Sequence, residues 1–160
     1  MILQEGDLQF EFNNVIDAFK FDEKDRSKET FHGLSHCMKA VDFIIETEEY
    51  YHFVEVKDYS TASENYFEDN YMDVINSLNI KFRDSFLYRW AEDRLDKPII
   101  YVCLLELENP MIPKIMKDLR LRLPSKNLPG RWRKKPVDKC FVVNVERWNK
   151  NFPDWKITRI

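Results

Sequence analysis

The order of apolar and polar positions along the chain predicts alternating helices and strands. Over residues 8–19 the apolar side chains recur every three or four positions, which is typical of an amphipathic helix, and Asp7 is placed to cap it. Residues 30–34 suit a short strand. Residues 38–46 and 50–58 are rich in β-branched and aromatic side chains, so they predict the two strands of a hairpin. The N-terminal part of the chain is therefore expected to hold one helix followed by three strands.

The rest of the chain continues this alternation. Thr61 and Glu64 fit a capping box, and the helix that it predicts keeps helical apolar spacing towards Arg94, with one break near its start as an alternative. Residues 99–105 form a continuous apolar run, as in a strand covered on both faces. The remaining predicted elements are a helix with one basic side after Pro110 and Pro113, a basic loop over residues 124–136, a strand at 140–145, and a short helix with a tail at 146–160.

These elements predict an α/β protein with a central mixed β-sheet flanked by helices, in a single domain over residues 1–160. The chain is 44% hydrophobic and has only three glycines, so it can bury a core and is not of the disordered class. It has no apolar run of the ~20 residues that a membrane helix needs, and its acid-rich N-terminus lacks the features of a signal peptide. We therefore expect a cytoplasmic protein that does not enter the membrane. The cysteines expected to be buried and reduced are Cys37, Cys103 and Cys140.

Charge is distributed unevenly along the chain. Residues 1–73 hold 18 acidic and 6 basic side chains, whereas residues 114–139 hold 10 basic and 2 acidic ones, so the formal net charge of −3 hides two segments of opposite sign. Because salt screens distant charges, a basic segment can contact phosphates even in an acidic protein. The net charge therefore argues against a general nucleic-acid coat protein but leaves a local nucleic-acid contact open.

Ionisable side chains interrupt the apolar sequence of the predicted hairpin. Because successive strand residues point to opposite faces, Glu55 and Lys57 share one face of their strand. Asp42 stands between Val41 and Phe43 in the preceding apolar strand, where a lone carboxylate is costly without a partner or a metal. Folding alone favours apolar residues at these positions. The trio of Asp42, Glu55 and Lys57 therefore has the pattern of a functional site.

This pattern resembles the catalytic signature of the PD-(D/E)XK nuclease superfamily, the restriction endonuclease-like proteins. In that signature an Asp on one strand is followed by Glu-x-Lys on the next, and here twelve residues separate Asp42 from Glu55-Val56-Lys57. The order of the predicted elements over residues 7–107 also resembles the superfamily's core of one helix, three strands, a helix and a fourth strand. Val41 stands in place of the Pro that names the superfamily. The resemblance implies a restriction endonuclease-like fold.

Ligand chemistry indicates what these residues could do. The carboxylates of Asp42 and Glu55 supply hard oxygen ligands for Mg²⁺ or Mn²⁺, with the carbonyl of Val56 as a further ligand. Lys57 could orient and help to deprotonate a water, or stabilise charge on the phosphoryl oxygens. The alternative is a half-exposed sheet on which Lys57 is only the salt-bridge partner of the two acids. Members of the superfamily often add an acid from the first helix. The candidates for it are Glu11 and Asp22.

Other polar groups are open to more than one interpretation. A polar stripe follows one side of the predicted long helix and is either a wall of the site or a solvated face. Its members are Lys81, Asp84, Ser85 and Tyr88. His32, His36 and Cys37 lack a fourth ligand at a suitable spacing, so a structural zinc site is disfavoured.

The basic loop surrounds an aromatic ring with cations, a combination that can hold phosphates and stack on a base. The residues of this basic segment are Lys126, Arg131, Trp132, Arg133, Lys134 and Lys135, with Lys139 beside them. The alternative is a solvated basic loop with Trp132 packed back into the core.

Together these features predict a nuclease that uses Mg²⁺ or Mn²⁺ to hydrolyse phosphodiester bonds, with DNA favoured over RNA and with a role in defence or repair. The alternative is a non-catalytic nucleic-acid-binding or protein-interaction subunit with the same fold. At 160 residues the chain has no separate recognition domain, so a homodimer or a partner protein would supply specificity.

Overall fold

The computed structural model describes residues 1–63, 65–107 and 110–160. These residues form eight strands and three helices, and five of the strands make one sheet. Across the sheet the strands are β3 (Asp17–Lys20), β4 (Phe43–Glu46), β5 (Tyr51–Asp58), β6 (Ile99–Glu106) and β7 (Lys139–Val143). β3, β4 and β5 pair antiparallel, whereas β5, β6 and β7 pair parallel. The expected α/β class with a central mixed sheet is therefore confirmed.

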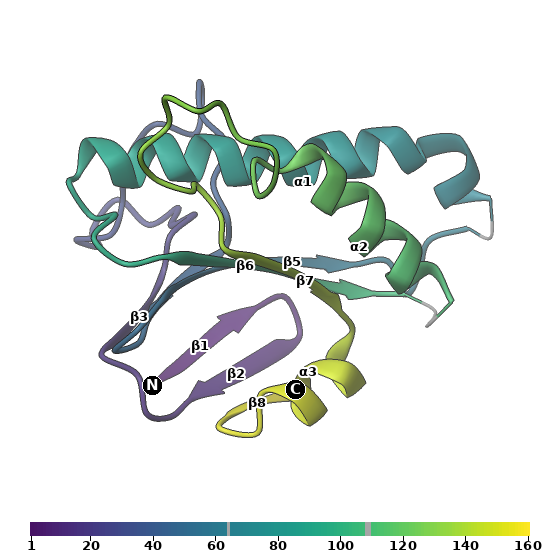
Figure 1. Cartoon of the computed structure of the whole chain (residues 1–160). Coiled ribbons are helices and arrows are strands. Elements are labelled where there is room, and N and C mark those ends of the chain that lie inside the picture. Colours follow the sequence, from purple (N-terminus) through teal and green to yellow (C-terminus); the bar gives the residue numbers. More distant parts are fainter. Residues whose placement is uncertain (64, 108–109) are drawn as a thin grey trace.

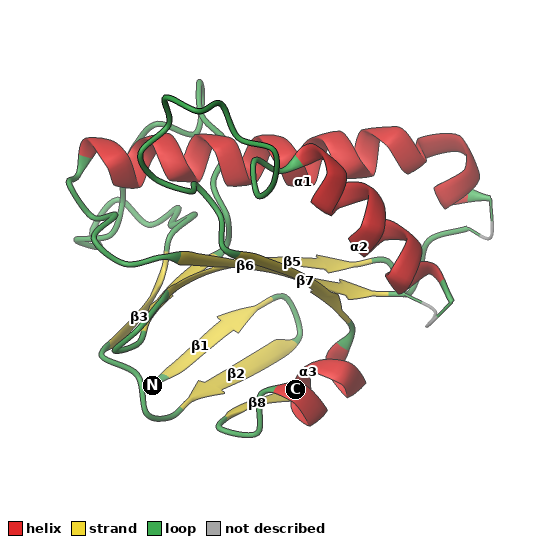
Figure 2. Ribbon diagram, in the orientation of Figure 1, coloured by secondary structure: helices red, strands yellow, loops and turns green. Residues whose placement is uncertain are grey.

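Two helices, α1 (Tyr66–Ala91) and α2 (Met111–Arg122), cover one face of this sheet (Figures 1 and 2). Phe53 of β5 and Tyr101 of β6 point to this face and lie in one buried cluster with Leu78 and Phe82 of α1. The Tyr101 hydroxyl donates a hydrogen bond of 2.9 Å to the carbonyl of Leu78, which fixes α1 against β6. The cluster between the central sheet and α1 consists of apolar side chains. An ionisable side chain buried beneath α1 therefore requires a physical explanation.

A second sheet covers the opposite face of the central sheet. Its antiparallel strands are β1 (Ile2–Glu5), β2 (Leu8–Phe12) and β8 (Trp155–Arg159), and the short helix α3 (Val145–Asn151) lies beside them (Figure 2). Phe10 and Trp148 bring this layer onto the central sheet, where the Phe10 ring meets that of Phe43 edge to face at 5.0 Å. Long helices therefore flank the central sheet on one face, and the second face carries a sheet and one short helix.

The predicted helix over residues 8–19 is wrong, because this segment forms β2, a turn and β3. Leu8, Phe10 and Phe12 are all buried while Gln9 and Glu11 point outwards, which is the two-residue period of a strand. β2 pairs with β8 from the far end of the chain, and this long-range pairing outweighs the local helical spacing.

Three further predictions about element bounds need correction. Residues 30–34 form no strand, and β3 provides the outer strand expected before the hairpin. β4 begins at Phe43, so Asp42 directly precedes that strand instead of lying inside it. α1 is unbroken from Tyr66 to Ala91, and its N-cap Asn65 makes no side-chain cap hydrogen bond. Glu64 of the predicted capping box lies outside the described residues.

The second half of the chain agrees more closely with the sequence. The predicted strand at 99–105 is β6, the helix after Pro110 is α2, and residues 124–136 form a loop. The predicted strand at 140–145 is β7, but it ends at Val143 because Asn144 caps α3. The tail of the chain was not expected to pair, yet it forms β8. Cys103 and Cys140 are buried, but Cys37 is exposed, contrary to the prediction. No helix in the described parts of the chain is long and apolar enough to cross a membrane.

Candidate functional site

The carboxylates of Asp42 and Glu55 come together beneath α1. Phe43 pairs with Val54 across β4 and β5, and this register brings Asp42 level with Glu55 on the adjoining strand. Asp42 is 6% exposed and Glu55 is 0% exposed. Oδ2 of Asp42 accepts a hydrogen bond of 2.7 Å from the N–H of Val56, which holds the Asp42 side chain against β5. The structure therefore brings together the two acids that the sequence singled out.

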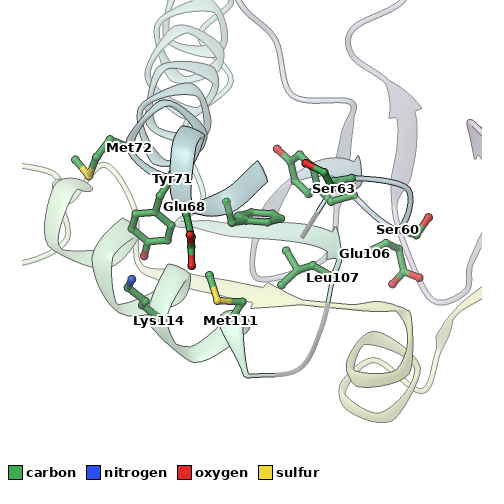
Figure 3. Close-up of a pocket in the computed structure, with 12 residues that line it drawn as sticks. Ser60, Ser63, Glu68, Tyr71, Met72, Glu106, Leu107, Met111 and Lys114 are labelled. Atoms are coloured by element: carbon green, nitrogen blue, oxygen red, sulfur yellow. The ribbon is translucent and has the colours of Figure 1, made fainter. Parts of the chain in front are cut away.

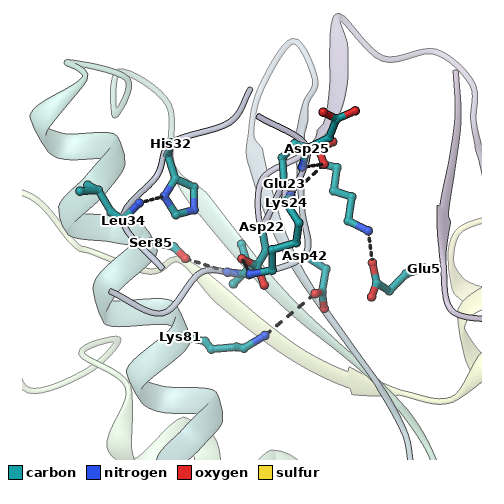
Figure 4. Close-up of polar contacts among 12 residues, drawn as sticks. Glu5, Asp22, Glu23, Lys24, Asp25, His32, Leu34, Asp42, Lys81 and Ser85 are labelled. Atoms are coloured by element: carbon teal, nitrogen blue, oxygen red, sulfur yellow. Dashed lines mark hydrogen bonds and ion pairs between the residues drawn. The ribbon is translucent and has the colours of Figure 1, made fainter. Parts of the chain in front are cut away.

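Two lysines neutralise this pair, and the closer one comes from α1. Nζ of Lys81 lies 2.8 Å from Oε2 and 2.7 Å from Oε1 of Glu55, and 4.0 Å from Oδ1 of Asp42. Nζ of Lys57 lies 3.4 Å from Oε1 of Glu55. The Lys81 side chain is 12% exposed and the Lys57 side chain 39%. The lysine of the motif is thus the one that meets solvent, whereas Lys81 is largely buried beside the carboxylates. Figure 4 shows the Lys81 side chain pointing to Asp42.

The sequence placed Lys81 only in a polar stripe, and that stripe turns out to position the site. Oγ of Ser85 accepts the Val41 N–H at 3.0 Å, and Oδ2 of Asp84 accepts the N–H of Lys39 at 2.9 Å. These bonds attach the segment that carries Asp42 to α1, and the one at Ser85 is drawn in Figure 4. Tyr88, the fourth member, packs edge to face on Phe21 at 5.1 Å. The interpretation of the stripe as a solvated face is therefore wrong.

The two candidates for an additional acid lie in different places. Asp22 follows β3, its side chain is 22% exposed, and its charge helps to raise the pKa of Lys81, so it lies at the edge of the site. Glu11 lies exposed on β2, in the layer that covers the opposite face of the central sheet. Sequence reasoning missed Glu5 of β1, which pairs with Lys20 at 2.7 Å and whose charge contributes to raising the pKa of Asp42.

Burial dominates the electrostatics of the pair. Burial, followed by the nearby charge of Asp42, raises the pKa of Glu55 to about 8, although Lys81 and Lys57 act in the opposite direction. Burial also raises the pKa of Asp42, against Lys81 and the hydrogen bond from Val56. For Lys81, burial lowers the pKa, but the attraction of Glu55 and Asp42 outweighs it, so the pKa ends above its usual value. Burial therefore favours the protonated forms of the two carboxyl groups, whereas the two lysines favour the ionised forms.

The oxygen atoms of the site suit a hard divalent cation. Oε1 of Glu55 is buried and accepts no hydrogen bond of good geometry from the described residues. Since N–H and C=O of an extended residue point to the same neighbour, the carbonyl of Val56 lies on the edge of β5 that faces Asp42. Within the described residues no three His, Cys, Asp or Glu side chains are grouped to hold a metal. The ligand set would be two carboxylates and one carbonyl, and Mg²⁺ commonly completes such a set with water and substrate phosphate.

His32 and Cys37, two of the three residues considered for a structural zinc site, make other contacts. Nδ1 of His32 accepts the N–H of Leu34 at 3.0 Å, and the His32 ring packs against Phe21 and Tyr88. Cys37 is exposed and its thiol donates to the carbonyl of Leu34. His32 is thus held by packing and a local hydrogen bond.

A cavity of about 1100 Å³ lies at the ends of β5 and β6, between the first turns of α1 and α2 (Figure 3). Tyr59 at its edge follows β5 directly, but none of Asp42, Glu55, Lys57 and Lys81 lines it. Its described lining carries the carboxylates of Glu68 and Glu106 against the one ammonium of Lys114. This excess of acidic side chains disfavours the binding of phosphate. The cavity is therefore not the expected place of phosphodiester hydrolysis, despite its size.

The basic segment is exposed throughout, including Lys126 and the run from Arg131 to Lys135. Trp132 is 48% exposed, so the alternative in which its ring packs back into the core is wrong. Leu123 and Val137, which flank the loop, are buried in the cluster beneath α1. The basic segment and the carboxylate pair therefore lie on the same side of the central sheet.

Comparisons with known proteins add no relative: no protein-family model, curated protein or solved structure matches this chain.

Proposed function

We propose that this protein is a metal-dependent nuclease that hydrolyses phosphodiester bonds. The observation that carries the proposal is the convergence of Asp42 and Glu55, from adjoining strands, on one buried position beside two lysines. Buried carboxylates are costly, and apolar side chains would serve the fold better at this place. A divalent cation that binds both oxygens would offset that cost.

The topology supports a restriction endonuclease-like assignment over residues 17–107. β3, β4 and β5 follow one another antiparallel, α1 crosses the sheet, and β6 returns parallel to β5. This is the order of three strands, a helix and a fourth strand that the resemblance implies. Asp42 stands at the start of the second strand, and Glu55 and Lys57 stand in the third. β1 and β2 take the place of the first helix, so this part of the resemblance fails.

The residues of the site would have different roles in hydrolysis. When bound, Mg²⁺ or Mn²⁺ supplies a Lewis acid that polarises the scissile phosphate and lowers the pKa of a water. Asp42 and Glu55 would hold the cation, with the Val56 carbonyl beside them. Lys57 reaches solvent and its ammonium lies 3.4 Å from Oε1 of Glu55, so it can orient the attacking water, donate a proton or stabilise charge on the phosphoryl oxygens.

The second candidate function is a non-catalytic nucleic-acid-binding or protein-interaction subunit. One observation favours it: the ammonium of Lys81 already neutralises Glu55 and approaches Asp42. In that case the pair would be a buried structural ion pair, and only the basic segment would act on nucleic acid.

The nuclease proposal is tested by incubating the purified protein with supercoiled plasmid, single-stranded DNA and RNA in Mg²⁺ and in Mn²⁺. At least one substrate should be cleaved, and EDTA should stop the reaction because the carboxylates alone cannot activate water. The activity should coelute with the 19.4 kDa chain in gel filtration or with an assembly of it. No cleavage of any substrate in either metal would leave the binding subunit as the function.

The basic segment should supply phosphate contacts, with DNA favoured over RNA. Replacing Arg131, Arg133, Lys134 and Lys135 by Ala should weaken binding across all sequences and reduce the slope of log K against log salt by about three to four. The matched control replaces Lys150 and Lys156, exposed cations of α3 and β8 beyond the opposite face, and should keep the slope. Fluorescence anisotropy over a salt series measures both, and an unchanged slope in the fourfold variant would make the segment merely solvated.

A further inference from the structure

The ammonium of Lys81 occupies the position where the two carboxylates converge. It bridges both oxygens of Glu55 at 2.7 and 2.8 Å and lies 4.0 Å from Oδ1 of Asp42. Glu55 is fully buried and the Lys81 side chain is 12% exposed, so water does not screen this contact as it would on the surface. Lys57 differs, because it touches only one oxygen of Glu55 and is 39% exposed.

A divalent cation at this position needs the same oxygens. Mg²⁺ binds carboxylate oxygens at about 2.0–2.1 Å, and an ammonium that also contacts both Glu55 oxygens would overlap and repel it. Lys81 and the metal therefore exclude one another at Glu55. A surface lysine would move aside at little cost, but Lys81 must give up two contacts in a buried site.

We propose that Lys81 is a built-in competitor of the metal, which must withdraw from Glu55 before a divalent cation binds. The inference rests on the proposed function, since the same carboxylates are the metal ligands. Without metal, the ammonium neutralises a carboxylate pair that burial would otherwise destabilise. With metal, the ammonium becomes a free donor beside the reacting phosphate.

The surroundings offer the displaced ammonium two acceptors. Asp22 lies at the edge of the site, where it already pairs with Lys24 at 2.5 Å, and the phosphate of a bound nucleic acid would be the second. Because a phosphate would draw Lys81 away from Glu55, nucleic acid should favour metal binding and metal should favour nucleic-acid binding. This coupling would weaken metal binding while no substrate is present.

The first test measures Mg²⁺ binding by calorimetry at pH 8.5 without nucleic acid. Lys81→Met should bind Mg²⁺ about tenfold more tightly than the native protein or better, because the competitor is absent. Lys57→Met, which removes an equal charge from the neighbourhood of the same Glu55 oxygen, should change the affinity by less than about threefold. Equal or weaker binding in Lys81→Met would overturn the inference.

A second test uses the native protein and so does not depend on the folding of a variant. Acetylation of lysines by a water-soluble reagent, followed by mass spectrometry of peptides, reports how often each ammonium is free. Saturating Mg²⁺ should raise the rate at Lys81 about fivefold or more, with Lys150 on α3 as the unchanged reference. An unchanged rate at Lys81 while Mg²⁺ raises the melting temperature would show that metal binds without displacing it, and would overturn the inference.

The outcomes separate this inference from the proposed function. Binding by Lys81→Met but not by the native protein would support the competitor, and the cleavage assay with metal and nucleic acid together would then decide the nuclease proposal. Equal binding by both would remove the competitor and leave the nuclease proposal standing. Binding by neither would overturn both.

Discussion

Lys57→Ala is expected to lower the rate of metal-dependent cleavage by about 10²–10⁴-fold, the range that one general acid or base contributes. Lys57 is the lysine of the site that reaches solvent, with its side chain 39% exposed and its ammonium 3.4 Å from Glu55. It can therefore act on water and substrate without being a metal ligand. Single-turnover cleavage measures the chemical step, and Mn²⁺ should still raise the melting temperature of the variant.

Asp42→Asn is the matched comparison, because it keeps the shape of the side chain but removes the charge that binds metal. This variant should lose both cleavage and the effect of Mn²⁺ on the melting temperature, whereas Lys150→Ala on α3 should keep both. Cleavage at the native rate by Lys57→Ala would take the chemical role away from Lys57. Loss of the Mn²⁺ effect in Lys57→Ala would make it a structural partner of Glu55.

The strands that carry the candidate site could be predicted because their signals are local. Residues 50–58 are rich in β-branched and aromatic side chains and become β5, and the apolar run at 99–105 becomes β6. Once these strands are placed, the period of two puts Glu55 and Lys57 on one face, and hairpin pairing brings Asp42 beside them. The convergence of the two acids follows from short-range pattern alone.

The second sheet could not be predicted in this way. Leu8 and Phe12 suit a helix as well as a strand, and only Phe10 between them favours the strand. Residues 8–12 form a strand because β2 pairs with β8, and in this pairing Phe10 lies opposite Ile157. No local window contains both partners, so the sequence leaves this choice open.

The burial of Lys81 could be predicted from the sequence, but its partner could not. Lys81 lies three residues after Leu78 and four before Ser85, and both of these face the sheet from α1. A charged residue on the same face must therefore be buried or reach a partner. Nothing in the sequence identifies Glu55 as that partner, because the crossing of α1 over β5 is a tertiary arrangement.

The titration of Glu55 provides the second large effect. Its pKa is raised from 4.5 to about 8 in the folded protein, so between these values the folded state binds more protons than the unfolded state. The free energy of unfolding should therefore fall as the pH rises through this window. Burial lowers the pKa of His52 from 6.5 to about 4, which has the opposite sign and acts below pH 6.5. The clear window for Glu55 is thus pH 6.5 to about 8.

Urea unfolding between pH 6.5 and 8 should show a slope that approaches about −1.4 kcal/mol per pH unit, the value for one proton. Glu55→Gln should remove this slope, because its amide does not titrate, whereas Glu46→Gln on β4 should keep it. Mn²⁺ binds the deprotonated carboxylates, so a saturating concentration should make the slope less negative or reverse it. A native protein whose stability is flat or rises over this window would mean that Lys81 and Lys57 keep Glu55 charged, and the carboxylate pair would then be available to metal at neutral pH without the loss of a proton.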